Sequence, residues 1–107
     1  MKHITTPDLE GMKNGLVFIH TPFCGTCQLA RKMLLTVESM EENNLFYDMN
    51  ASLYPNYMQD NQIESVPCLL IFHEGEIKEK VYAFQSVTNI YLKIGAYNQT
   101  SRLFPEK

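Results

Sequence analysis

Apolar positions along the chain fall into short continuous runs, which predict strands. The segments Leu16–His20 and Cys68–His73 are apolar over most of their length, as interior strands are. Leu45–Asn50 predicts a further interior strand. Glu76–Tyr82 alternates apolar with charged residues, which is typical of a strand with one face in water, and the preceding pair Glu74–Gly75 predicts a hairpin turn.

Two longer stretches carry apolar residues at helical spacing. The first predicted helix begins at or near Cys24 and ends at Asn43–Asn44, and the second follows a Ser86 cap and ends near Asn98. The first helix is predicted to face inward through Leu29, Met33, Leu34, Val37 and Met40. Its predicted solvent side carries Arg31, Lys32 and Glu38. The second helix is predicted to face inward through Val87, Ile90, Tyr91, Ile94 and Tyr97.

Weaker signals predict a short edge strand at Lys2–Ile4 and two short helices. Thr6 is the predicted cap of the first helix, with Pro7 at its first position, and the turn pair Asn14–Gly15 lies beyond its end. Pro55–Asn61 predicts the second short helix.

The resulting element order, β-α-β-α-β-α-β-β-α, predicts an α/β fold. Right-handed crossovers followed by a closing hairpin give a mixed central β-sheet flanked by helices on both faces. A chain of 107 residues has room for one core. Residues 1–107 are therefore predicted to form a single domain, with a tail at residues 100–107.

Composition and charge exclude several classes of function. The net charge is −3, and no block of basic residues is longer than the pair Arg31–Lys32, so the electrostatic footprint of a nucleic-acid-binding protein is missing. The first residues lack the apolar core of a signal peptide, and the apolar runs are too short to span a bilayer. We therefore expect a cytoplasmic protein with no nucleic-acid partner and no membrane partner.

The motif Cys24-Gly25-Thr26-Cys27 carries the candidate chemistry. Two residues between cysteines on the first turn of a helix bring the sulfurs within bonding distance. The first cysteine then sits where free N–H groups and the helix dipole favour a thiolate, which lowers its pKa. We interpret Cys24 as the nucleophile and Cys27, one turn deeper, as the resolving thiol of a redox pair that needs no other cofactor.

The same cysteines could instead bind a metal. A CxxC pair is also half of a zinc site, and a metal or iron–sulfur module would use Cys24 and Cys27 with Cys68 or His20. A second CxxC pair is missing, so we expect no metal. A redox-inactive adaptor is a third interpretation, which the presence of both cysteines disfavours.

A second motif, Glu64-Ser65-Val66-Pro67-Cys68, opens the predicted strand at Cys68. Proline at the mouth of an interior strand removes a hydrogen-bond donor. It is explained if the Val66–Pro67 bond is cis and forms a tight turn, and the alternative is a trans proline that merely starts the strand.

Together the two motifs resemble the thioredoxin family. The sequence FCGTC is similar to the family's WCGPC site, and ESVPCLLIFHEGE to its cis-proline segment. The element order is similar over residues 2–98, and the chain resembles the small thioredoxin-like proteins of low-GC Gram-positive bacteria. A CxxC motif near a βαβ pattern is a general signature of this family.

The resemblance implies a thiol–disulfide oxidoreductase, most simply a protein-disulfide reductase. Its implied partners are protein disulfide clients and an electron donor, either a thioredoxin-reductase-type enzyme or a low-molecular-weight thiol. It also implies a cis Pro67 against the cysteine pair and client pairing with the Val66 backbone. The implied docking surface is bordered by Gly25, Thr26, Val66, Tyr82 and Ala83.

Several positions depart from the family pattern. The family's buried carboxylate falls on Phe18 and its lysine partner near Phe46. His20 is a candidate substitute base beside the thiolates, or else a packing residue. Phe23 replaces the family tryptophan and is expected to shield one flank of the site. Cys68 is expected to be a buried inert thiol, and the alternative is a disulfide to Cys27 or a regulatory adduct.

Overall fold

The described part of the chain contains one five-stranded sheet. The structure is a computed structural model that describes residues 1–40 and 45–101, with only the backbone described over 97–101. The strand order is β1-β3-β2-β4-β5, and β1, β3 and β2 run parallel to one another while β4 and β5 are antiparallel to their neighbours. The strands are β1 Lys2–His3, β2 Gly15–His20, β3 Phe46–Asn50, β4 Cys68–His73 and β5 Glu76–Val81.

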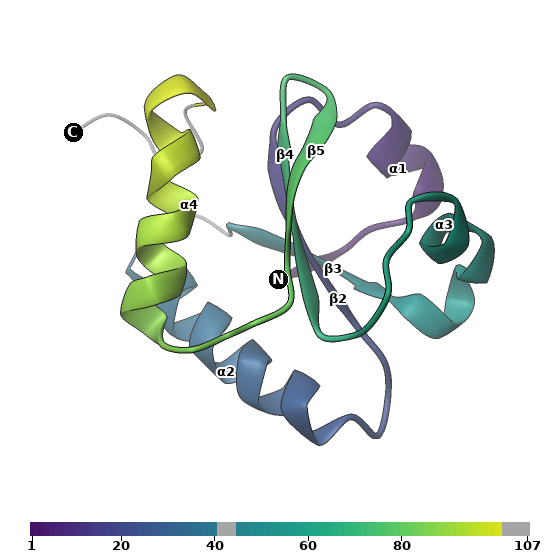
Figure 1. Ribbon diagram of the computed structural model, residues 1–107, viewed down its shortest axis with the longest axis horizontal. Coiled ribbons are helices and arrows are strands. Elements are labelled where there is room, and N and C mark those ends of the chain that lie inside the picture. The colour runs from purple at the N-terminus through teal and green to yellow at the C-terminus, as the bar shows by residue number, and fades with distance from the viewer. Residues whose placement is uncertain (41–44, 102–107) are drawn as a thin grey trace.

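Helices cover both faces of this sheet (Figure 1). The two long helices, α2 and α4, lie on one side, and the two short helices, α1 and α3, lie on the other. This arrangement confirms the predicted α/β class with a mixed sheet between two helical layers. The helices are α1 Thr6–Glu10, α2 Gly25–Ser39, α3 Pro55–Asp60 and α4 Val87–Ser101, and a 3-10 turn at Ala51–Leu53 precedes α3.

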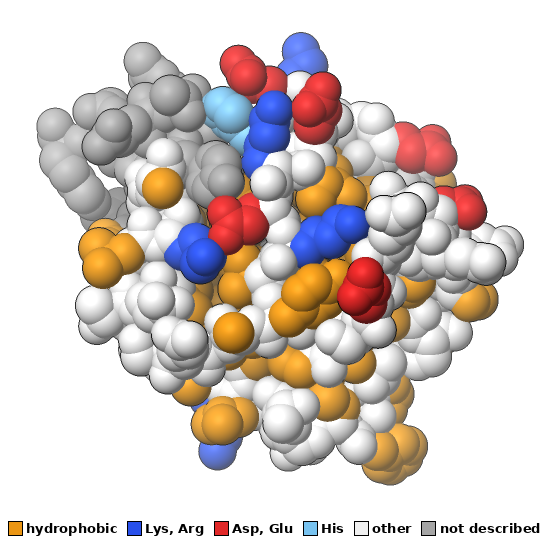
Figure 2. Space-filling view, viewed as in Figure 1, with side chains coloured by type: hydrophobic (Ala, Val, Ile, Leu, Met, Phe, Trp, Pro, Cys, Tyr) orange, Lys and Arg blue, Asp and Glu red, His pale blue; other side chains and the backbone are white. Residues whose placement is uncertain are grey.

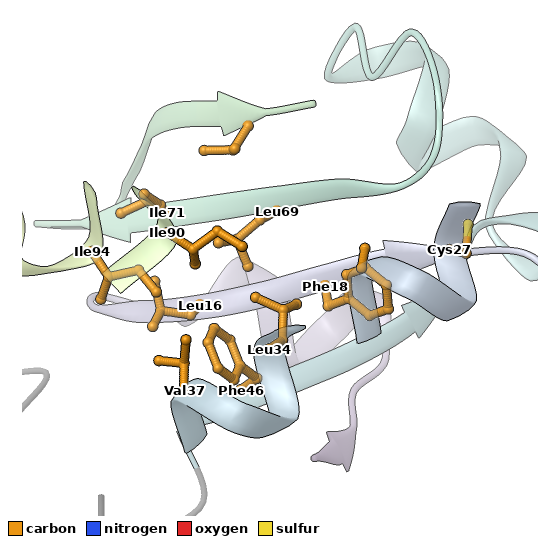
Figure 3. Close-up of a cluster of buried hydrophobic side chains, with 12 residues drawn as sticks. Leu16, Phe18, Cys27, Leu34, Val37, Phe46, Leu69, Ile71, Ile90 and Ile94 are labelled. Atoms are coloured by element: carbon orange, nitrogen blue, oxygen red, sulfur yellow. The ribbon is translucent and has the colours of Figure 1, made fainter. Parts of the chain in front are cut away.

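Each face of the sheet buries its own hydrophobic core. Because side chains alternate along a strand, Leu16 and Phe18 of β2 face α2 and α4, while Val17 and Ile19 face the short helices. Figure 3 shows the first core, where Leu34 and Val37 of α2 and Ile90 and Ile94 of α4 meet the strands. The two central strands β2 and β4 are apolar up to their final histidine, because both of their faces are covered.

Predicted strand boundaries agree with the structure to within one residue. The first short helix is capped by Thr5 rather than Thr6, because the Thr5 N–H and hydroxyl both donate hydrogen bonds to Asp8 Oδ2, at 3.1 and 2.9 Å. The predicted cap of α4 is present, since Ser86 Oγ accepts from the Asn89 N–H at 3.0 Å. That helix continues to Ser101, into the predicted tail. Residues 102–107 and the predicted helix end at Asn43–Asn44 lie outside the described residues.

The predicted inward face of α2 is wrong at three positions. Leu29 and Met40 are more than half exposed, whereas Glu38 is buried. The Glu38 carboxylate accepts hydrogen bonds from the N–H groups of Leu45 and Phe46, at 2.8 and 2.9 Å. A buried charge is tolerated when it is hydrogen-bonded, and here it supplies partners to the backbone that enters β3.

Candidate active site

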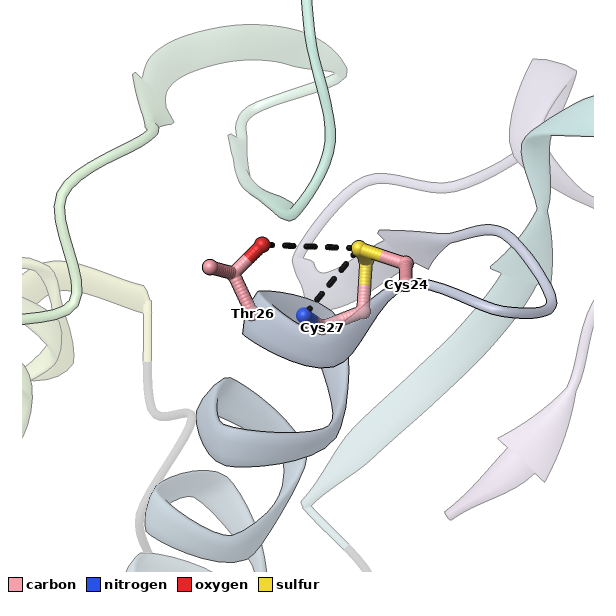
Figure 4. Close-up of a disulfide and its surroundings, with 3 residues drawn as sticks. All are labelled: Cys24, Thr26 and Cys27. Atoms are coloured by element: carbon pink, nitrogen blue, oxygen red, sulfur yellow. Dashed lines mark hydrogen bonds between the residues drawn. A yellow bond between two sulfur atoms is a disulfide. The ribbon is translucent and has the colours of Figure 1, made fainter.

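Cys24 and Cys27 form a disulfide at the N-terminus of α2 (Figure 4). The loop after β2 brings the chain to Cys24, which is the N-cap of the helix, and the Cα atoms of the two cysteines are 5.1 Å apart. The Cys27 N–H donates a hydrogen bond to Cys24 Sγ at 3.1 Å. A thiolate at Cys24 would occupy the position in which an N-cap side chain normally accepts such a bond, so the fold stabilises negative charge on this sulfur.

The two sulfurs differ in their access to solvent. Cys24 is half-buried, and Cys27 is only 3% exposed and belongs to the core beneath α2. Gly25 and Thr26 between them are exposed, and the Thr26 hydroxyl lies 3.5 Å from Cys24 Sγ. Cys24 is therefore the more accessible of the two sulfurs.

Phe23, immediately before the pair, does not shield the site as expected. Its side chain is fully exposed, at 102%, and its backbone is in the left-handed region with φ +60°. This conformation is unfavourable for a bulky residue. It turns the chain from the loop into α2 and leaves the ring in solvent.

An apolar groove of about 300 Å³ lies beside the cysteine pair. It joins Thr26 to Pro67, whose bond to Val66 is cis, and to Tyr82 at the end of β5. The Glu64 N–H donates to the Tyr82 hydroxyl at 3.2 Å, which ties Tyr82 to the segment before Pro67. The full lining is Thr26, Leu29, Ala30, Pro67, Tyr82 and Phe84. Figure 2 shows apolar side chains gathered over the lower half of the face that carries β5.

The groove includes two residues that sequence reasoning missed. Helical spacing places Leu29 in the core, and Phe84 lies in the connection after β5, which has no periodic signal. Val66 is half-buried and packs against both cores. Ala83 is exposed and lines a separate shallow hollow with Lys80 and Lys93. Tyr82 lines both hollows, whereas Ala83 lines only the second.

A larger hollow, of about 730 Å³, lies on the opposite side of the sheet between α1, α3 and the β4–β5 turn. Its lining contains neither cysteine of the pair, and residues such as Tyr54 and Ile77 line it instead. The smaller groove is the one next to the redox pair, because its lining includes Thr26, which lies between the two cysteines.

A buried carboxylate lies close to the site, on β3. Asp48 pairs in register with Phe18, and its side chain is 4% exposed. Arg31 Nη1 of α2 lies 3.1 Å from Asp48 Oδ2, and His3 Nδ1 contacts Asp48 Oδ1. His20 Nε2 lies 3.7 Å from Asp48 Oδ2. Sequence reasoning missed Asp48, although its position two residues after the inward Phe46 places it on the α2 side of the sheet.

The β3 residue opposite Phe18 is Asp48, and Phe46 pairs with Leu16 in the core. The His20 ring stacks on Phe18 with centroids 5.5 Å apart, and the Arg31 guanidinium lies over the same ring at 5.3 Å. Burial, and then the Arg31 charge, lower the pKa of His20, and the Asp48 charge acts in the opposite direction.

Cys68 belongs to the core on the other face of the sheet. It is fully buried and packs with Ile19 and Leu70, whereas Cys27 packs beneath α2. Burial raises the pKa of the Cys68 thiol to about 12. The alternative Cys27–Cys68 disulfide is therefore not supported, because the sheet separates the two sulfurs. Within residues 1–40 and 45–101, His, Cys, Asp and Glu form no group of three arranged to hold a metal ion.

The fold and the site together define a class of protein. A disulfide at the N-terminus of a long helix, with one accessible and one buried sulfur beside an apolar groove, is the site of a thiol–disulfide oxidoreductase. No helix within the described part of the chain is long and apolar enough to cross a membrane.

Comparisons with known proteins identify the family. The Thioredoxin family model matches residues 8–95. The thioredoxin-like protein YusE of Bacillus subtilis (strain 168) is 43% identical over 93 residues, which cover 85% of this chain and 88% of that protein. The chain therefore belongs to the thioredoxin family, and it is a thiol–disulfide oxidoreductase.

Solved structures have the same fold. A mutant thioredoxin from Halobacterium salinarum NRC-1 is 18% identical with a TM-score of 0.76, covering 90% of this chain and 88% of that one. Reduced desulfothioredoxin from Desulfovibrio vulgaris Hildenborough is 18% identical with a TM-score of 0.73, covering 89% of this chain and 95% of that one.

Proposed function

We propose that this protein reduces disulfide bonds in client proteins in the cytoplasm, with Cys24 as nucleophile and Cys27 as resolving thiol. The observation that supports these roles is the Cys27 N–H directed at Cys24 Sγ at 3.1 Å, combined with the burial of Cys27. The first stabilises a thiolate at Cys24, and the second keeps Cys27 away from external disulfides.

The reaction proceeds by two exchanges. In the first, the Cys24 thiolate attacks one sulfur of a client disulfide, and the other client sulfur leaves as a thiolate and takes up a proton. In the second, the Cys27 thiol loses its proton and attacks Cys24 Sγ. The bond between Cys24 and the client breaks, the second client sulfur leaves, and Cys24 and Cys27 end as a disulfide. Two electrons have passed to the client.

The oxidised pair must then be reduced by an external donor. The proposed donor is a thioredoxin-reductase-type enzyme or a low-molecular-weight thiol, which returns two electrons through the same exchange chemistry. The pair itself is the redox group, and we propose no further cofactor and no metal.

The cytoplasmic assignment rests on the third thiol, Cys68, which is free and buried and suits a reducing compartment. We also propose that residues 1–107 form one domain.

Client binding is proposed to use the groove beside the pair. Backbone groups of Val66 would pair with an extended client segment, as in strand addition, while Pro67, Tyr82 and Ala83 border it. Gly25 and Thr26 are exposed next to Cys24, so a client segment can approach the sulfur without displacing a side chain. His20 is proposed to assist proton movement at the pair.

Reduction of insulin disulfides, followed by precipitation of the separated chains, tests the proposal. The reduced wild-type protein should accelerate the reaction, Cys24→Ser should abolish the acceleration, and Cys27→Ser should accumulate a mixed disulfide with insulin through Cys24. Cys68→Ala is the matched control and should retain activity. A Cys24→Ser variant as active as the wild type would overturn the assignment.

A further inference from the structure

Buried Asp48 and half-buried Arg31 have no role in the exchange steps described above, and His20, which contacts Asp48, has been given no partner that positions its ring. We propose that Asp48 is a positioning residue that holds the His20 imidazole so that His20 takes the proton released by the Cys27 thiol. This inference rests on the proposed function and names the group that makes its second exchange possible.

The cluster lies on the same side of the sheet as the resolving thiol. Phe18 and His20 point to one face of β2 because they are two residues apart, and Phe18 and Cys27 belong to the core of that face. Figure 3 shows Phe18 on β2 with Cys27 beyond it, toward the end of the strand. His20 is the last residue of β2, one strand repeat nearer to that end than Phe18.

The active-site helix is joined to Asp48 through Arg31. Arg31 is four residues after Cys27, so the two side chains lie on neighbouring turns of the same face of α2. Arg31 Nη1 lies 3.1 Å from Asp48 Oδ2. The carboxylate on β3 therefore fixes the turn of α2 that follows Cys27, and it faces His20 at the same time.

The His20 ring has one nitrogen that is buried and unsatisfied. Nε2 has no hydrogen-bond partner within the described part of the chain, although Asp48 Oδ2 is 3.7 Å away. That distance is too long for a hydrogen bond in the resting protein. When the imidazole gains a proton, both nitrogens become donors, and Nε2–H can close onto the carboxylate to form a charge-assisted bond. Asp48 thus stabilises the protonated form, and Nδ1 is the nitrogen that accepts the proton.

The charges around His20 favour a neutral ring at rest. Burial and the charges of Arg31 and His3 oppose protonation, while Asp48 alone supports it. A base of this kind is unprotonated near neutral pH and can accept a proton as soon as one is released nearby. Removing the Asp48 charge leaves only the opposing influences, so the ring becomes a weaker base.

The proton balance closes without any further reactant. The Cys27 thiol gives its proton to His20 across an intervening water molecule. The Cys27 thiolate attacks Cys24 Sγ, and the departing client thiolate receives the proton from the imidazolium. His20 ends neutral, and the cysteine pair ends as a disulfide.

The test separates the two exchanges with 5,5′-dithiobis(2-nitrobenzoate), which releases one coloured thiolate on attack by Cys24 and a second on attack by Cys27. Both phases are followed by stopped-flow absorbance across a range of pH. Asp48→Asn should leave the first phase unchanged. It should slow the second phase about tenfold near neutral pH and shift its acid limb to lower pH. His20→Gln should slow the second phase by about 10²-fold, the lower end for a general base. The double variant should be no slower than His20→Gln alone.

Glu38→Gln is the matched control, because Glu38 and Asp48 are the buried carboxylates among the described residues. It should alter neither phase. If Asp48→Asn lowers stability but leaves the second phase and its pH profile unchanged, Asp48 is structural and the inference is wrong. If the first phase is absent in the wild type, the proposed function itself fails.

A second measurement does not depend on the Asp48 variant folding. The His20 ring is titrated by NMR in the wild-type protein, oxidised and reduced. The midpoint should be higher in the reduced protein, because a neighbouring thiolate favours the imidazolium. Identical midpoints in both states would show that His20 and the pair are not coupled, and would overturn the inference.

Discussion

The backbone N–H of Cys27 donates a hydrogen bond to the sulfur of Cys24, 3.1 Å away. This bond stabilises a thiolate at Cys24, the proposed nucleophile, through the backbone of Cys27, the proposed resolving residue. The first turn of α2 buries Cys27 to 3% exposure and leaves Cys24 half-buried. The proposed order of reaction, Cys24 first and Cys27 second, rests on this difference in exposure.

Iodoacetamide should alkylate the reduced protein at Cys24 first. Cys24 combines access with a stabilised thiolate, whereas Cys27 is buried and Cys68 has a pKa raised to about 12. Peptide mapping by mass spectrometry at neutral pH identifies the labelled residue, and a denatured sample serves as the control in which all three cysteines react. Preferential labelling of Cys27 or Cys68 in the folded protein would contradict the assignment.

The buried thiol of Cys68 should make the protein less stable at alkaline pH. Its pKa is raised by burial from 9.0 to about 12, with Tyr82 and Lys80 opposing the shift more weakly. The unfolded chain loses this proton as the pH rises above about 9, while the folded protein keeps it until about 12, so the stabilising contribution is lost across this interval. Urea unfolding from pH 8 to 10 should show a steeper decline for the wild type than for Cys68→Ala. Parallel curves would refute this.

His20 should make the folded protein less stable at acid pH. Burial, followed by the Arg31 charge, lowers its pKa from 6.5. As the pH falls below about 6.5, the unfolded chain takes up a proton at His20 before the folded protein does, so the folded state loses stability as the pH falls. His20→Gln should flatten this part of the curve in urea unfolding experiments. An unchanged slope would mean that His20 titrates equally in both states.

Substitution of Phe23 should relieve the backbone strain at this position without loss of buried contacts. The side chain is fully exposed and buries nothing, but φ is +60°. Asparagine tolerates this conformation, so Phe23→Asn should raise the free energy of unfolding by about 1 kcal/mol. Phe23→Ala keeps a residue that disfavours this conformation, and its stability should stay near that of the wild type. Thermal and urea unfolding measure both, and equal stabilities for the two variants would argue against strain at this position.

Removing the Glu38 carboxylate should destabilise the entry into β3. Glu38→Ala leaves the N–H groups of Leu45 and Phe46 without their acceptor, which should lower the free energy of unfolding by about 2–6 kcal/mol, at about 1–3 kcal/mol for each unsatisfied group. Glu38→Gln keeps an oxygen acceptor, so its loss in free energy of unfolding should be less than about half of the loss for Glu38→Ala. Calorimetric unfolding of the two variants gives the comparison, and a Glu38→Ala protein as stable as Glu38→Gln would show that these hydrogen bonds contribute little.

Local patterns in the sequence were enough to predict the fold class and the redox pair. The apolar run at Leu16–His20, the alternation at Glu76–Tyr82 and the cap at Ser86 each depend on neighbours in the chain, and each appears in the structure within one residue of its predicted position. The Cys24–Cys27 pair is equally local, since a two-residue spacing on the first turn of a helix sets the geometry by itself.

Features that join distant segments were decided only by the tertiary structure. Asp48 meets His20 and Arg31 because β2 and β3 pair in parallel with Phe18 opposite Asp48, and a shift of one residue would have sent the carboxylate to the other face. Leu29 and Phe84 meet across a groove between α2 and the connection after β5. Cys68 is next to Pro67 in sequence, yet its sulfur belongs to the opposite core from that of Cys27. Helical spacing alone also misjudged Glu38, because its hydrogen-bond partners lie at the start of β3 rather than in its own helix. Strand register and the packing of helices on the sheet set these contacts, and no short stretch of sequence contains them.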